Sequence, residues 1–127
     1  MSWTGMLAVG GGAAVGAWLR WWLSAALNAM LPSLPLGTLA ANLIGAYLIG
    51  VAFAAFTYFE TLSPELRLLV VTGFLGGLTT FSTFSAEAAE LVARAQYGWT
   101  AVLLASHVVG SIVLTLAGAA SFRLVLG

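Results

Sequence analysis

The chain has 127 residues, of which 61% are hydrophobic and only 6% are charged, and its formal net charge is zero. A soluble domain of this size leaves a large share of its surface in water, so this composition excludes an ordinary soluble domain and indicates a membrane protein. There is one histidine and no cysteine, aspartate or lysine, so we expect no enzyme, no thiolate metal site and no nucleic-acid partner.

Four apolar segments are each long enough to cross a bilayer, which requires about 20 helical residues. They cover residues 6–26, 36–59, 66–92 and 100–124. Prolines, glycines and polar residues between them are typical of turns. We predict an all-α integral membrane protein in which residues 1–127 form a single domain of four transmembrane helices, surrounded by membrane lipid.

Short motifs mark the ends of the third segment and the packing faces of the first two. Ser63-Pro64-Glu65 combines a hydroxyl N-cap, a proline at the first helical position and an acid in the first turn, which predicts a helix start. Gln96-Tyr97-Gly98 is expected to turn the chain before the fourth segment. Small residues four apart favour close helix packing in lipid; they are Ala8, Gly12 and Gly16 in the first segment and Gly37, Ala41 and Gly45 in the second.

The four arginines divide evenly between the two ends of a four-helix protein. With both termini on one side, Arg67 and Arg123 lie there, whereas Arg20 and Arg94 lie on the other side. Membrane orientation normally follows an excess of Lys and Arg on the cytoplasmic side, so this tie predicts insertion in both orientations. Two oppositely oriented copies can pair as an inverted repeat made from separate chains. A tie can also arise by chance among so few charges.

The centre of the third segment is poorly suited to a helix. Gly76-Gly77-Leu78-Thr79-Thr80 combines glycines with β-branched residues around the segment's midpoint, Thr79. We predict a helix break at residues 76–80, which frees carbonyl oxygens that only a partner helix, water or a bound cation can satisfy inside a membrane. A glycine bend for close packing is the alternative.

An aromatic motif, Phe81-Ser82-Thr83-Phe84-Ser85, follows the predicted break directly. Phe81 and Phe84 share one helix face, and Ser82 and Ser85 lie on the adjacent face. The positive edge of a phenyl ring can line the path of a small anion without holding it as tightly as a full charge would. Aromatic residues in a membrane helix usually just pack, and that alternative stays open.

Two other segments place polar side chains at a similar depth. Thr38 and Asn42 are four residues apart, and the amide of Asn42 can donate to a partly dehydrated anion. His107, Ser111 and Thr115 form a second polar stripe on the fourth segment. Each of these side chains taken alone can also form an ordinary hydrogen bond within the helices.

Arg20 is a charged residue in the first apolar segment, and such a charge is a functional candidate by default. It either faces a water-filled vestibule, where it attracts anions, or snorkels to the interface beside its neighbouring tryptophans. Glu87, Glu90 and Arg94 are interpreted as an interfacial cluster in which Glu90 and Arg94 pair four residues apart.

Three strings together resemble the Fluc (CrcB) fluoride channels over essentially the whole chain. They are Gly10-Gly11-Gly12-Ala13 continuing through Gly16-Ala17 to Arg20, Gly37-Thr38-Leu39 with Asn42 and Gly45, and Gly73-Phe74 with the uninterrupted run from Gly76 to Phe84. The resemblance implies a dual-topology, antiparallel homodimer with two fluoride pores in the bacterial inner membrane.

The resemblance also implies roles for individual residues. A structural sodium ion (Na+) at the dimer centre would be held by the backbone oxygens of Gly76 and Thr79 from both subunits. The fluoride pathway would be lined by Phe81 and Phe84, with polar contacts from Asn42, Ser82, Thr38 and Ser111 and with Arg20 in the vestibule.

We therefore expect a fluoride-selective channel that passively exports fluoride and lowers its cytoplasmic concentration. All four glutamates lie toward helix ends, so no proton-coupling carboxylate is visible at the midplane. A small dual-topology multidrug or cation exporter is the alternative, but it needs an acid in the first helix, which carries Arg20 instead. A structural or assembly subunit without transport is a third possibility.

Overall fold

The structure is a computed structural model that describes residues 1–127, and it contains only helices and the turns that connect them. Four rods run antiparallel. The first is α1 (Trp3–Leu27), followed by the short 3-10 turn η1 (Asn28–Met30), and the second is α2 (Leu36–Tyr58). The third rod is built from α3 (Pro64–Arg67), the π-helical η2 (Leu68–Leu75), α4 (Gly76–Leu78) and α5 (Phe81–Ala93), and the fourth is α6 (Tyr97–Leu126).

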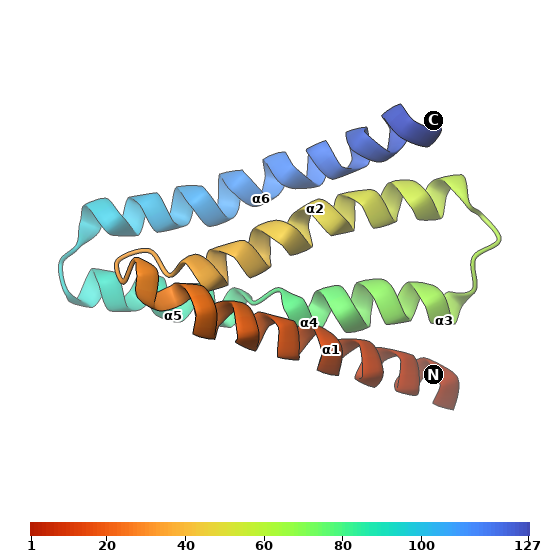
Figure 1. Ribbon diagram of the computed structural model, residues 1–127, viewed down its shortest axis with the longest axis horizontal. Coiled ribbons are helices and arrows are strands. Elements are labelled where there is room, and N and C mark those ends of the chain that lie inside the picture. Colours follow the sequence, from red (N-terminus) through yellow and green to blue (C-terminus); the bar gives the residue numbers. More distant parts are fainter.

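Figure 1 shows both chain termini at the same end of the molecule as the α2–α3 connection, with the α1–α2 and α5–α6 connections at the other end. Along its first half, η2 and α4, the third rod packs against α1. Its second half, α5, packs against α6, and α6 packs in turn along α2. The interruption of the third rod therefore lies between two different helix packings.

Hydroxyl caps set where two of the rods begin. The Oγ atom of Ser2 accepts a hydrogen bond of 3.0 Å from the Gly5 amide, so α1 begins at Trp3, earlier than the predicted residue 6. Ser63 caps the third rod by accepting from the Leu66 amide at 3.1 Å, as its motif predicts.

The connection between α5 and α6 differs from the sequence prediction. The turn falls at residues 94–96, and Tyr97 and Gly98 already belong to the first turn of α6. Ala95 supplies the turn with a φ of 57°, in the left-handed region that glycine usually occupies. The Gln96 amide then donates to Leu91 O at 2.9 Å, which closes the end of α5. The prediction placed the turn at residues 96–98 because glycine is a typical turn residue. The positive φ is instead adopted by Ala95, and Gly98 is helical.

Glycines allow α1 and the third rod to approach closely. A Cβ atom at Gly16 would collide with the backbone of η2 and α4, and one at Gly77 would collide with the backbone of α1. Gly12 and Gly73 repeat this contact one turn away. The predicted packing role of the small residues in the first helix is confirmed for these glycines, and their partner is the interrupted rod.

Three rods are long and apolar enough to cross a membrane. They are Leu36–Tyr58, Pro64–Ala93 and Tyr97–Leu126, with mean hydropathies of 2.0, 1.5 and 2.0. The sequence predicts four such helices. At 25 residues α1 has the length to span a membrane, but its glycines, tryptophans and Arg20 make it less apolar than the other rods.

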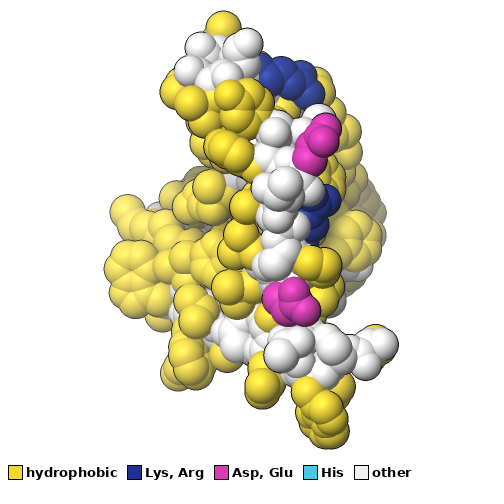
Figure 2. All heavy atoms as spheres, turned by 90° about the vertical axis from the view of Figure 1, so that its right-hand side faces the viewer, with side chains coloured by type: hydrophobic (Ala, Val, Ile, Leu, Met, Phe, Trp, Pro, Cys, Tyr) yellow, Lys and Arg dark blue, Asp and Glu magenta, His cyan; other side chains and the backbone are white.

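Most of the apolar side chains face outward. Only 23 of the 127 residues are buried, too few to form the core of a water-soluble domain. Figure 2 looks onto the end that carries the two termini and shows a few charged side chains on an otherwise largely hydrophobic surface. The many exposed apolar side chains along the rods are compatible with lipid or a partner chain and not with water.

Candidate functional site

The third rod is interrupted at two residues, Thr79 and Thr80. Their backbone is extended, with φ and ψ of −84° and 153° at Thr79 and −148° and 110° at Thr80. The interruption is narrower than the predicted residues 76–80, because Gly76, Gly77 and Leu78 stay helical as α4. Close packing of the glycines on α1 favours the helical conformation there, so the two β-branched residues that follow carry the break.

Asn42 of α2 binds both backbone groups of Thr80. Its Oδ1 accepts from the Thr80 amide at 2.7 Å, and its Nδ2 donates to the Thr80 carbonyl at 3.1 Å. A side-chain amide thus takes the place of a neighbouring backbone and satisfies groups that the break exposes. Thr80 in turn caps α5, because its Oγ1 accepts from the Thr83 amide at 3.1 Å.

Arg20 reaches the break from the opposite side. Its Nε donates to the Gly77 carbonyl oxygen at 3.0 Å, across the interface between α1 and α4. The sequence left a vestibule position and an interfacial position open for this residue, and neither alternative includes a bond to the backbone of the third rod. Arg20 and Asn42 therefore hold the two sides of the interruption.

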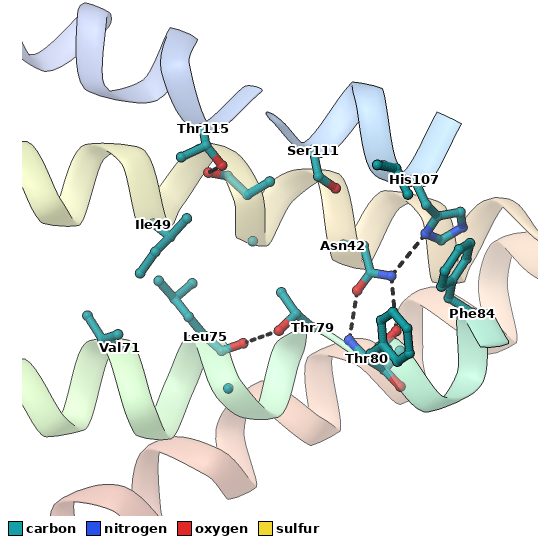
Figure 3. Close-up of a pocket in the computed structure, with 15 residues that line it drawn as sticks. Asn42, Ile49, Val71, Leu75, Thr79, Thr80, Phe84, His107, Ser111 and Thr115 are labelled. Carbon is teal, nitrogen blue, oxygen red and sulfur yellow. Dashed lines mark hydrogen bonds between the residues drawn. The ribbon is translucent and has the colours of Figure 1, made fainter. Parts of the chain in front are cut away.

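A cavity of about 430 Å³ opens beside the break, between η2, α2 and α6. Figure 3 shows side chains from these helices and from α5 around it, with the Asn42 amide on one side next to Thr80, Phe84 and His107. Among the predicted site residues, those that line the cavity are Asn42, Gly76, Thr79, Thr80, Phe81, Phe84 and Ser111, together with His107 and Thr115. The predicted residues outside its lining are Arg20, Thr38, Gly77, Leu78 and Ser82.

The two phenylalanines of the aromatic motif have different surroundings. Phe81 is 78% exposed on the open side of the cavity, whereas Phe84 is only 6% exposed and belongs to a small core with Leu91 and Leu103. Their ring centroids are 5.6 Å apart at an interplanar angle of 66°, an edge-to-face arrangement. Phe81 is therefore free to contact a partner or an ion, and Phe84 also stabilises the packing of α5 on α6.

The polar stripe of α6 makes unequal contacts. His107 is 4% exposed and its Nδ1 lies 3.0 Å from Asn42 Nδ2, so it joins the hydrogen-bond network of the break. Thr115 donates to the Ala46 carbonyl of α2 at 3.0 Å and is thereby satisfied. Ser111 lies between them on the cavity wall, where its hydroxyl has no hydrogen-bond partner in the chain.

The sequence analysis placed Glu87 in an interfacial cluster with Glu90 and Arg94, and the structure gives it a different partner. Glu90 and Arg94 do form an exposed ion pair. Glu87 instead accepts a hydrogen bond of 2.6 Å from Thr38 Oγ1, and the Thr38 side chain is fully buried. The spacing contains a signal for this position: Glu87 follows Phe84 by three residues and so shares its inward face.

Comparison with known proteins places this architecture in a family. Residues 7–119 match the family described as "CrcB-like protein, Camphor Resistance (CrcB)". Three relatives bear the name "Fluoride-specific ion channel FluC". The one from Nitrosospira multiformis is 59% identical over 113 residues, 89% of this chain and 88% of its own. Those from Pseudomonas putida and Pseudomonas paraeruginosa are 55% and 53% identical and cover 96% and 98% of both chains, respectively. The chain therefore belongs to the CrcB-like family.

Proposed function

We propose that this protein is a fluoride-selective ion channel of the bacterial inner membrane, with multiple membrane-spanning helices, which exports fluoride passively and lowers its cytoplasmic concentration. The observation that carries the proposal is an identity of 59% to a protein named as a fluoride-specific ion channel. The cavity at the helix break supports it, because aromatic rings and a few uncharged polar groups line it. The protein is a channel and not an enzyme.

Passive export follows from the chemistry of fluoride. At acidic external pH fluoride crosses the membrane as neutral HF, and it dissociates inside to the trapped anion. A membrane potential that is negative inside drives the anion outward with about 2.3 kcal/mol for each ~100 mV. A selective leak is therefore sufficient, and no energy-coupling site is required.

The proposed assembly is an antiparallel homodimer of dual topology, in which α1 is the fourth membrane-spanning helix of each subunit. Both termini lie at one end, so Arg67 and Arg123 stand against Arg20 and Arg94 at the two ends of the rods without an excess on either. Arg20 is accommodated within the bundle by its bond to Gly77. The open cavity and the exposed Phe81 beside it offer a surface for the second subunit.

The proposed sodium ion has suitable backbone oxygens at the break. The Thr80 amide, which a continuous helix would direct at Gly76 O, donates to Asn42 instead, and no hydrogen bond is directed at Thr79 O. Gly76 and Thr79 both line the cavity, and their carbonyl oxygens are suitable ligands for a hard monovalent cation. Gly76 and Thr79 from two subunits would hold the ion at the dimer centre, where its charge would stabilise the paired interruptions.

The proposed fluoride pathway follows the aromatic and polar side chains on either side of the break. Phe81 and Phe84 would direct ring edges at the ion, and the polar groups would replace part of its water shell. Arg20 would raise the local anion concentration in the vestibule. The polar positions are Asn42, Ser82, Thr38 and Ser111.

Ion efflux from liposomes containing the purified protein tests the function directly. We expect fast fluoride efflux, negligible chloride efflux and loss of fluoride efflux in the Phe81→Ile variant. Phe59→Ile, at the end of α2 and outside the cavity, is the matched control and should conduct normally. A folded wild-type protein that retains fluoride in the liposomes would contradict the channel function, and equal effects of both substitutions would contradict the pathway.

A further inference from the structure

A second cavity, of about 570 Å³, lies between α2 and the third rod. Val71 lines both this cavity and the one at the break, so the two are neighbours along the same pair of rods. The second cavity lies next to the α2–α3 connection, which Figure 1 shows at the end of the molecule that carries the two termini. Eight residues line it; one of them is Arg67 and none is acidic. This cavity therefore contains a full positive charge, which the cavity at the break lacks.

The second cavity lies at the depth of a membrane surface. Pro64, in its lining, is the first residue of the third membrane-spanning rod, and Thr57 belongs to the last turn of α2. Tyr58 and Phe59 are exposed at the same end of α2, and aromatic side chains of this kind are typical of the zone of lipid headgroups. A headgroup of the surrounding bilayer can therefore reach the cavity from the side.

Arg67 is a cation without a counter-charge. The one ion pair of the chain joins Arg94 and Glu90, so the Arg67 guanidinium is paired with no carboxylate. Its Cζ atom lies 5.2 Å from the centroid of the Phe56 ring, and its Nη2 donates to Phe56 O over a long distance of 3.5 Å. The contacts with Phe56 hold the guanidinium in place and leave most of its five N–H groups without a partner in the chain.

The lining of the cavity fits an anionic phosphate ester that carries an apolar chain. A planar guanidinium can donate to two phosphate oxygens at once, and Thr72 supplies a hydroxyl to the same cavity. Phe53 and Val71 give the cavity an apolar wall for the hydrocarbon. A zwitterionic headgroup brings an ammonium group as well, and the lining contains no carboxylate to receive it. The charges therefore favour an anionic phospholipid over a zwitterionic one.

We propose that this cavity binds the headgroup of an anionic phospholipid, with the phosphate on the Arg67 guanidinium and an acyl chain against Phe53 and Val71. Basic pockets between membrane helices are suited to such headgroups. The proposed dimer centre, at Gly76 and Thr79, lies about three helical turns farther along the third rod, so the second subunit and the lipid occupy different parts of the surface. The proposal does not depend on the fluoride-channel function.

Native mass spectrometry of the delipidated protein in a non-ionic detergent measures lipid binding directly. With phosphatidylglycerol and phosphatidylcholine added in equal amounts, the wild type should retain phosphatidylglycerol selectively. An Arg67 side chain that only extends to water at the membrane surface, or a groove filled by the second subunit, would leave the protein without this preference and would overturn the proposal. This comparison uses the wild type alone and needs no variant to fold.

Two matched arginine substitutions locate the lipid site. Arg67→Met should weaken the binding of phosphatidylglycerol about 10- to 100-fold, the loss of hydrogen bonds to a charged group. Arg123→Met is the control, because Arg123 is exposed in the last turn of α6 at the same end of the molecule and lies outside the cavity. We expect it to bind the lipid as the wild type does. Equal losses in both variants would show a general attraction of anionic lipid to this end and would overturn the proposal.

Inorganic phosphate distinguishes a membrane lipid from a free anion as the occupant. At the concentration of the lipid it should not displace phosphatidylglycerol, because it lacks the acyl chain that contacts Phe53 and Val71. Displacement by inorganic phosphate would show that the cavity takes a free anion and would contradict the lipid site.

Discussion

The two halves of the interrupted third rod are held by different kinds of contact. The first half, η2 and α4, meets α1 backbone to backbone, because glycines on both sides leave no room for a Cβ atom. The second half, α5, is held by side chains: Phe84 packs in a small core with Leu103 of α6, and Glu87 is bonded to Thr38 of α2. The break lies where the two kinds of contact meet.

Because of this difference, we expect the first half of the third rod to be rigid and the second half to be adjustable. Backbone contacts between glycines offer no rotamers, so the first half is a rigid support for the carbonyl groups of α4. Aromatic and polar side chains can rotate, so the second half can respond to an ion in the cavity. Arg20 attaches the break to the rigid side and Asn42 attaches it to the adjustable side.

The largest expected effect comes from closing the space between α1 and the third rod. In Gly16→Ala the new Cβ would meet the backbone of Phe74 and Leu78, which cannot move aside as a side chain would. We expect destabilisation at or above the upper end of about 1–3 kcal/mol for overpacking, with loss of folded protein in thermal unfolding and size-exclusion measurements. Gly11→Ala lies on the same helix with nothing within 4 Å and should be neutral. Equal stability of the two variants would show that this contact is not rigid.

Removing the amide that spans the break should have the next largest effect. Asn42→Leu keeps the size of the side chain but deletes its bonds to Thr80 and His107. At about 0.6–1.7 kcal/mol for each interhelical bond in a membrane, the variant should unfold at a clearly lower temperature and lose fluoride efflux. An unchanged unfolding temperature would mean that the break is maintained from the α1 side alone.

The hydrogen bond from Arg20 to the first half of the third rod should contribute less to stability than the bonds of Asn42. Arg20→Met keeps much of the aliphatic stem and leaves Gly77 O without its donor, a loss of about 0.6–1.7 kcal/mol. The fluoride rate should fall as well if Arg20 supplies the positive charge that we propose for the vestibule. Arg94→Met removes an exposed arginine near the same end of the rods and is the control. If both variants lower efflux equally, the effect comes from surface charge and not from the bond to the break.

The smallest effect on stability and efflux is expected for a residue outside the contacts of the third rod with α1, α2 and α6. Glu90→Gln removes the exposed ion pair with Arg94, which lies four residues along α5. Such helix pairs contribute about 0.3–0.5 kcal/mol, so thermal stability and fluoride efflux should stay close to those of the wild type. A large loss of efflux would show that the end of α5 belongs to the ion pathway and would extend the adjustable region to the membrane surface.

The sequence by itself determined the features that depend on local pattern. Composition established a membrane protein, the Ser63-Pro64 motif established the start of the third rod, and the glycine spacing established a packing face on α1. The run around Thr79 marked the interrupted region because glycine and β-branched residues disfavour a helix wherever they occur. Apart from the overall composition, each of these features follows from neighbours within a turn or two of the chain.

Only the tertiary structure decided which groups meet at the break. Arg20 and Gly77 are 57 residues apart, and Asn42 and His107 are 65 apart, so no local pattern contains these bonds. Packing against α1 kept α4 helical and confined the break to two threonines. The fold also placed Glu87 beside Thr38 and not in the exposed pair. Hydrogen-bond partners at such separations are selected by how the rods pack, and that packing is a property of the whole chain.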